Sequence, residues 1–103
     1  MTNRIRASVG QGGVNDPQDV GIVQHLLNVV GQRTGERLLD VDGLVGPLTN
    51  AAIRKFQSKH CRVADGRVDP GQETIAALNR LAPQSAVNDG VSFLTRKGGS
   101  GLA

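Results

Sequence analysis

The chain has 103 residues, which leaves room for one compact domain but not for a second, catalytic one. It is 38% hydrophobic and 20% charged, as in a globular protein, and it lacks both the roughly 20 consecutive apolar residues of a membrane span and the apolar centre of a secretory signal. The formal net charge of +3 favours anionic partners, but the basic residues are scattered, so neither a membrane nor a nucleic acid is the predicted partner.

The first predicted helix follows a loop formed by residues 1–16. It should run from Pro17 to about Val30, because proline is well tolerated in a first helical turn. Gly31 is placed to end it. Apolar residues recur at helical spacing within this range, at Val20, Val23, Leu26, Leu27 and Val30.

The second predicted helix begins at Pro47 and should extend to about His60. Its apolar face is expected to contain three residues that recur at every fourth position. These residues are Leu48, Ala52 and Phe56.

The third predicted helix begins at Pro70, with Asp69 placed to cap it and Gln72 placed to complete a capping box. Pro83 ends it, and the glycine-rich residues 84–103 are expected to form a flexible tail or linker. The apolar face of this helix is predicted at Ile75, Leu78, Leu81 and Ala82.

Three short helices with long connections predict an all-α fold, a compact three-helix orthogonal bundle over residues 17–83. The segments between the helices leave room only for turns or a brief extended pair, so β-structure should be minor. Packing alone must hold the fold, because the single cysteine, Cys61, has no internal disulfide partner. We expect a monomer.

One short motif occurs twice, each time directly before a predicted helix. Residues 42–47 are Asp-Gly-Leu-Val-Gly-Pro and residues 65–70 are Asp-Gly-Arg-Val-Asp-Pro. In both copies we expect a tight turn in which glycine takes a positive φ and aspartate bonds its own backbone. The valine that follows should enter the core. The second copy has two extra residues before its threonine, Thr74.

In order and spacing, these elements resemble the small peptidoglycan-binding domain family. The family pattern is a Val-x-x-Leu-Gln-x-x-Leu helix, an Asp-Gly-x-Phe-Gly-x-x-Thr turn, an Ala-Val-x-x-Phe-Gln helix and a second Asp-Gly-x-Val-Gly-x-x-Thr turn. The resemblance covers about residues 8–82 and is carried by Val20, Val23, Gln24, Leu27, residues 42–49, Ala52, Ile53, Phe56, Gln57, residues 65–68, Thr74 and Leu78.

The resemblance implies a non-catalytic module that binds the bacterial cell wall, in which Gln24 and Gln57 hold loop backbone groups. Residues 8–20 are also similar to a subgroup attached to type VI secretion effectors and phage lytic enzymes. That subgroup implies synthesis in the cytoplasm without a Sec signal, and action at the wall or periplasm after injection or lysis. The chain departs from the family pattern at Val45, at Asp69 and at residues 61–63.

No catalytic, metal or cofactor site is predicted. The strong zinc ligands available are His25, His60 and Cys61, and they lack the spacing of a zinc motif. Asp40 and Asp42 are close in sequence, but nothing indicates the cleft or the raised pKa of a glycosidase pair.

The predicted ligand is the stem peptide of peptidoglycan rather than its glycan. Sugars usually stack on Trp or Tyr, and the chain has neither. A groove between the helices would instead bind peptide carboxylates through basic side chains and loop backbone groups. The residues predicted to line this groove are Asp42, Leu44, Arg54, Arg62, Asp65 and Arg67.

Two alternatives stay open. The same scaffold could be a protein adaptor that docks an effector onto a secretion-apparatus protein of the spike or onto a phage baseplate, as the absence of Trp and Tyr favours. A basic three-helix nucleic-acid binder would instead use Arg54, Lys55 and Lys59 of the second helix, although scattered charge and long loops disfavour it.

Overall fold

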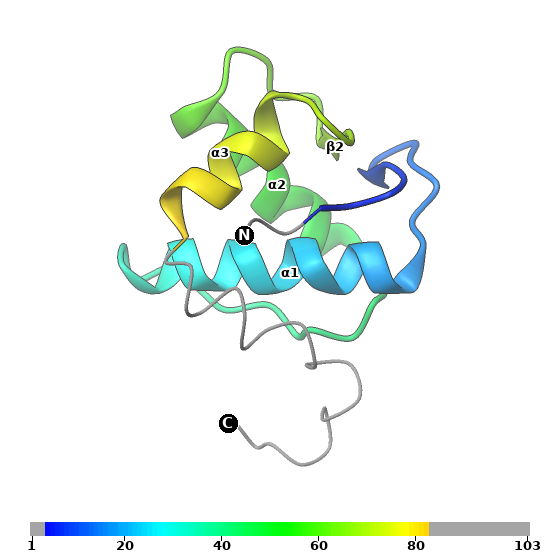
Figure 1. Ribbon diagram of the computed structural model, residues 1–103. Helices are drawn as coiled ribbons and strands as arrows, with labels where there is room; N and C mark the ends of the chain where they lie inside the picture. Colours follow the sequence, from blue (N-terminus) through cyan, green and yellow to red (C-terminus); the bar gives the residue numbers. More distant parts are fainter. Residues whose placement is uncertain (1–3, 83–103) are drawn as a thin grey trace.

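The computed structural model describes residues 4–82, which form three helices and one small sheet. The helices are α1 (Pro17–Gln32), α2 (Pro47–His60) and α3 (Glu73–Leu81), and the strands are β1 (Val9–Gly10) and β2 (Arg67–Val68). In Figure 1, α1 lies across α2 and α3, and the segment that joins α1 to α2 returns along α1. The predicted all-α class with minor β-structure is confirmed. Pro83 and the predicted tail, residues 84–103, lie outside the described residues.

α1 begins as predicted but ends two residues later than predicted. At its start, the Asp16 side chain accepts a hydrogen bond from the Gln18 N–H at 3.0 Å, and Pro17 occupies the first turn. Gly31 is a buried helical residue, and Gly35 takes the left-handed conformation with φ of +75°. The Glu36 N–H then donates to the Gly31 carbonyl at 2.9 Å, which completes the C-terminal cap.

α2 has the predicted bounds but a different buried face. Leu48 is exposed rather than buried, so the predicted stripe is wrong at that position. The buried residues of α2 are Thr49, Ile53, Phe56 and Gln57. Two of these, Thr49 and Gln57, are polar and are buried because they form the hydrogen bonds described below. A search for regularly spaced apolar residues cannot find them.

α3 begins at Glu73, three residues after the predicted start, and the predicted capping box is wrong. The Gln72 N–H donates to the Asp69 carbonyl at 3.3 Å, and Gly71 has φ of +71°. With Pro70 before this glycine, the four residues form a type II turn. The Asp69 carboxylate pairs with the Arg67 guanidinium at 3.0 Å instead of capping the helix. This turn accommodates the two extra residues that the second Asp-Gly motif has before Thr74.

The segment before α1 belongs to the core. Val9 is fully buried and pairs with Val68 in the antiparallel sheet, and Ile5 is 5% exposed. Buried Asp19 ties this segment to α1, because its carboxylate accepts hydrogen bonds from the backbone N–H groups of Arg6 and Ala7, both at 3.1 Å. Within residues 4–82, no helix combines the length and apolar character that a membrane crossing requires.

Candidate functional site

The first Asp-Gly corner is held by the buried side chain of Gln24. Its Nε2 donates to Asp42 Oδ1 at 3.1 Å, to the Leu44 carbonyl at 2.9 Å and to Thr49 Oγ1 at 3.1 Å. Its Oε1 accepts from the N–H groups of Asp42 at 3.1 Å and Gly43 at 3.0 Å. One α1 side chain thus fixes the loop that starts α2.

The second corner repeats this arrangement one helix later. Gln57 Nε2 donates to Asp65 Oδ1 at 3.1 Å, to the Arg67 carbonyl at 2.9 Å and to Thr74 Oγ1 at 3.1 Å. Gln57 Oε1 accepts from the Gly66 N–H at 2.8 Å. The structural role that the family resemblance implied for both glutamines is confirmed.

The two aspartates of these corners bond their own turns, as predicted. Asp42 Oδ1 accepts from the Leu44 N–H and Asp65 Oδ1 accepts from the Arg67 N–H, each at 3.0 Å. The glycines that follow them have φ of +77° and +78°. The hydrogen bond from the Arg67 N–H, together with that from Gln57, lowers the pKa of the Asp65 carboxyl below its usual value.

The six residues predicted to line one groove are divided between these corners. Asp42 and Leu44 line a hollow of about 270 Å³ beside the first corner, which we call the leucine hollow. It has three exposed leucines, Leu38, Leu44 and Leu48.

The other predicted groove residues lie at the second corner. Arg54 donates to Gln11 and passes close to Gly66, Arg67 pairs with Asp69, and Arg62 contributes its backbone N–H to Glu73 Oε1 at 3.0 Å. Whether any of the six contacts a ligand stays a prediction.

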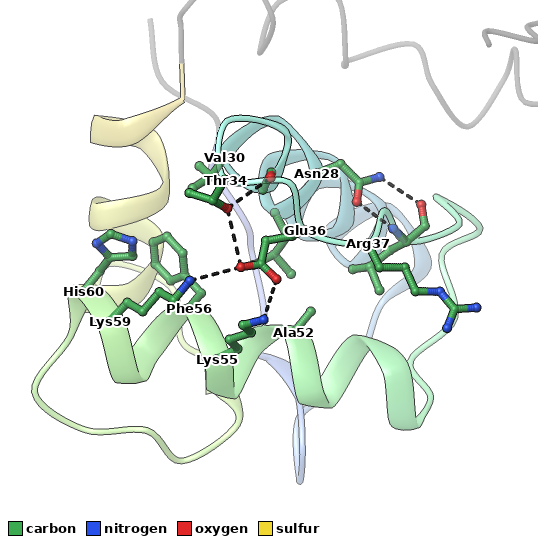
Figure 2. A pocket seen from close by; sticks show the side chains of 13 residues that line it. Asn28, Val30, Thr34, Glu36, Arg37, Ala52, Lys55, Phe56, Lys59 and His60 are labelled. Carbon is green, nitrogen blue, oxygen red and sulfur yellow. Dashed lines mark hydrogen bonds and ion pairs between the residues drawn. The ribbon is translucent and has the colours of Figure 1, made fainter.

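A second hollow lies between the end of α1, residues 34–39 and α2, and encloses about 80 Å³. Its apolar lining includes Leu27, Val30, Leu39, Ala52 and Phe56. We call it the lysine hollow, because Lys55 and Lys59 of α2 stand at its edge (Figure 2). Arg37 and Leu39 line both hollows, so the two adjoin.

Glu36 lies between the two lysines. Its Oε1 accepts from Lys55 Nζ at 2.6 Å and its Oε2 from Lys59 Nζ at 3.0 Å, as Figure 2 shows. All three charges reach solvent, with side chains 26% exposed for Glu36, 58% for Lys55 and 47% for Lys59. The hydrogen bonds from Lys55 and then Lys59 lower the pKa of the Glu36 carboxyl from 4.5 to about 2.

The backbone on both sides of Glu36 is fixed. The C-terminal cap of α1 holds it on one side through Gly31, and a β-carbon at Gly31 would come within 3.1 Å of Glu36 Cβ. On the other side, Asn28 forms two hydrogen bonds with the backbone of Leu39, at 2.7 and 2.9 Å. The carboxylate is thereby directed at the lysines.

This charge cluster was not predicted as a site. One part of it is visible in the sequence, because Lys55 and Lys59 are one helical turn apart and therefore lie on the same face of a helix, next to Phe56. Glu36 is 19 and 23 residues away from them, and only the folded chain brings it between them.

The lowered pKa of Glu36 predicts a pH-dependent contribution to stability. The contribution is fully present above about pH 4.5 and is lost as pH falls towards 2, because the folded-state pKa lies below the unfolded one. It should be modest, since the pairs are exposed. Urea unfolding of the wild type and of Glu36→Gln, from pH 7 to 2, should give a stability difference that shrinks below pH 4.5 and weakens in 1 M salt. A difference that stays constant over this range would contradict it.

Among residues 4–82, no group of three or more His, Cys, Asp or Glu side chains could hold a metal ion. The hollows instead offer apolar walls with hydrogen-bonding and charged groups at their edges, an arrangement suited to binding a small ligand.

Residues 16–78 match the family model described as "Putative peptidoglycan binding domain". No curated protein and no solved structure matched the chain. The matched region covers more than half of the chain and includes α1, α2, both Asp-Gly corners and most of α3. With the repeated glutamine-held corners, this match shows that the chain belongs to the peptidoglycan-binding domain family.

Proposed function

We propose that this peptidoglycan-binding module binds the stem peptide of the wall and thereby holds an attached lytic enzyme or secreted effector on its substrate. The observation that carries the proposal is the lysine hollow, where an apolar lining adjoins two accessible lysines. Stem peptides present small aliphatic groups beside free carboxylates, which is the chemistry that this lining complements.

The aromatic content supports peptide rather than glycan as the ligand. The chain has no Trp or Tyr, and Phe56, the phenylalanine within the described residues, is 6% exposed and therefore not available to stack on a sugar. Because Arg37 and Leu39 line both hollows, an extended peptide of several residues can pass from the lysine hollow to the leucine hollow.

Binding by the isolated module should be weak, with a Kd in the micromolar to millimolar range as an order of magnitude. Small, exposed hollows bury little surface, and association costs entropy. Weak binding is sufficient for targeting, because a tether raises the local concentration of the attached protein near its polymer.

Retention on purified sacculi tests the proposal. The double variant Lys55→Gln/Lys59→Gln should be retained about tenfold less than the wild type, which corresponds to a loss of about 1.4 kcal/mol in binding free energy. The matched control is Arg6→Gln/Arg80→Gln, which removes the same charge from two exposed residues that line neither hollow. A third variant, Leu44→Asn, tests in the same assay whether the leucine hollow, which contains this residue of the predicted groove, contributes to retention.

Two results would contradict stem-peptide binding at the lysine hollow. One is equal retention of the two double variants. The other is retention of the wild type no greater than that of an unrelated basic domain of equal charge, which would show attraction by charge alone.

A second candidate function, a protein adaptor on a contractile secretion spike or phage baseplate, is favoured by the leucine hollow. Leu38, Leu44 and Leu48 are 50%, 68% and 59% exposed around one hollow, and exposed apolar clusters often mark protein contacts. A spike or baseplate protein that co-purifies with the module, while sacculi do not retain it, would decide for this function.

A further inference from the structure

We infer that the lysine hollow selects a zwitterion, namely the end of a stem-peptide diamino acid whose terminal carbon bears both a free amine and a free carboxylate. The inference rests on the proposed function and names the part of the stem peptide that this hollow accepts. It is drawn from the signs and positions of three charges, those of Glu36, Lys55 and Lys59. Arg37 also lines the hollow, but its guanidinium points away from these three groups (Figure 2).

A ligand with only one charge meets a like charge in this hollow. A lone carboxylate that approaches the lysines must lie beside the Glu36 carboxylate, which already bonds both of them. A lone amine that approaches Glu36 must lie beside two ammonium groups. A ligand that carries both charges on one carbon offers a partner to each side, so neither repulsion is left unbalanced.

The hydrogen bonds of Glu36 indicate which of its two ion pairs, with Lys55 or with Lys59, would break when the ligand binds. Its Oε1 holds Lys55 at 2.6 Å, whereas its Oε2 holds Lys59 at the longer distance of 3.0 Å and also accepts from Thr34 Oγ1 at 3.4 Å. The ligand carboxylate would take Lys59 and the ligand amine would take Oε2, while the shorter pair with Lys55 stays intact. One ion pair is exchanged for two, with no change in net charge.

The size and lining of the hollow match such a group. A volume of about 80 Å³, enough for about three waters at about 30 Å³ each, limits the bound group to the end of one side chain rather than a whole residue. Val30, Leu39 and Ala52 line the hollow and are only partly buried, so the methylene chain of the diamino acid would meet apolar atoms.

The test is a titration of the full chain, followed by NMR, with three synthetic stem tripeptides that differ only at the end of the third residue. The first ends in meso-diaminopimelate, with amine and carboxylate; the second ends in lysine, with the amine alone; the third keeps the carboxylate and has hydrogen in place of the distal amine. We expect the first to bind about tenfold more tightly than either of the others, with shifts centred on residues of the lysine hollow.

Two glutamine variants distinguish recognition from a general effect of charge. Glu36→Gln removes both the partner of the amine and the competitor of the carboxylate, so its preference for the first peptide over the third should be lost, and the third peptide should bind it at least as tightly as the first. Glu73→Gln changes the only other glutamate of the chain, which lies outside the hollow, and should keep the wild-type preference.

The outcomes separate this inference from the proposed function. Equal binding of the three peptides by the wild type, or an unchanged preference in Glu36→Gln, overturns zwitterion selection even if sacculi retain the module. Failure of the module to bind sacculi and all three peptides overturns the proposed function as well.

Discussion

Replacement of Gln57 by leucine is expected to lower the free energy of unfolding by about 4 kcal/mol, because leucine fills the space but makes none of the four hydrogen bonds. The Gly66 N–H and the Arg67 carbonyl would be left without this partner at the second corner. Each buried polar group left unsatisfied costs about 1–3 kcal/mol, and a domain of this size has only about 5–15 kcal/mol in total. Urea unfolding monitored by circular dichroism measures the loss.

The control for this prediction is Gln18→Leu, the same exchange at an exposed position in the first turn of α1. It should change the free energy of unfolding by less than about 0.5 kcal/mol. Equal stability of the two variants would show that apolar burial at Gln57 compensates fully for the lost hydrogen bonds.

The two glutamines explain how so small a core holds three crossed helices. Gln24 lies on α1 and fixes the loop that begins α2, and Gln57 lies on α2 and fixes the loop that begins α3. Each of the first two helices therefore carries the side chain that orients the next one. The repeated Asp-Gly motif in the sequence is one half of this device, and the glutamine of the preceding helix is the other.

The helices were predictable because their signals are local. Pro17 and Pro47 occupy first turns, and the apolar spacing of α1 survives in the structure. Pro70 misled because proline's fixed φ suits the second position of a β-turn as well as a first helical turn. Gly31 misled the prediction of the end of α1 for a similar reason. A glycine can lie within a helix or cap its end, and here Gly31 packs against Glu36 inside the helix while Gly35 is the capping glycine.

The site was less predictable than the fold. The sequence allowed Asp42 and Asp65 to be either turn residues or ligand contacts, and the structure shows the turn bonds that were expected of them. The lysine hollow depends on contacts between α1, residues 34–39 and α2, and no spacing rule places Glu36 between Lys55 and Lys59.

Replacement of Gly10 by alanine is expected to lower the free energy of unfolding by about 2–5 kcal/mol. The new β-carbon would lie 2.2 Å from the Gly66 carbonyl oxygen, and Gly10 has φ of +114°. The positive φ costs about 1–2 kcal/mol and overpacking costs about 1–3 kcal/mol. The Gly10 backbone cannot move away freely, because Asn15 bonds its N–H at 2.7 Å and its carbonyl at 3.1 Å. Thermal and urea unfolding would both report the loss.

Gly35→Ala separates the two costs of the Gly10 variant. Gly35 has φ of +75°, but a β-carbon there meets no atom within 4 Å, so only the conformational cost of about 1–2 kcal/mol should appear. The excess loss in Gly10→Ala then measures the close approach of β1 to the second Asp-Gly corner. If the two variants lose equal stability, the strand pair has moved apart without penalty, and contact between Gly10 and Gly66 is not what fixes the N-terminal segment on the helices.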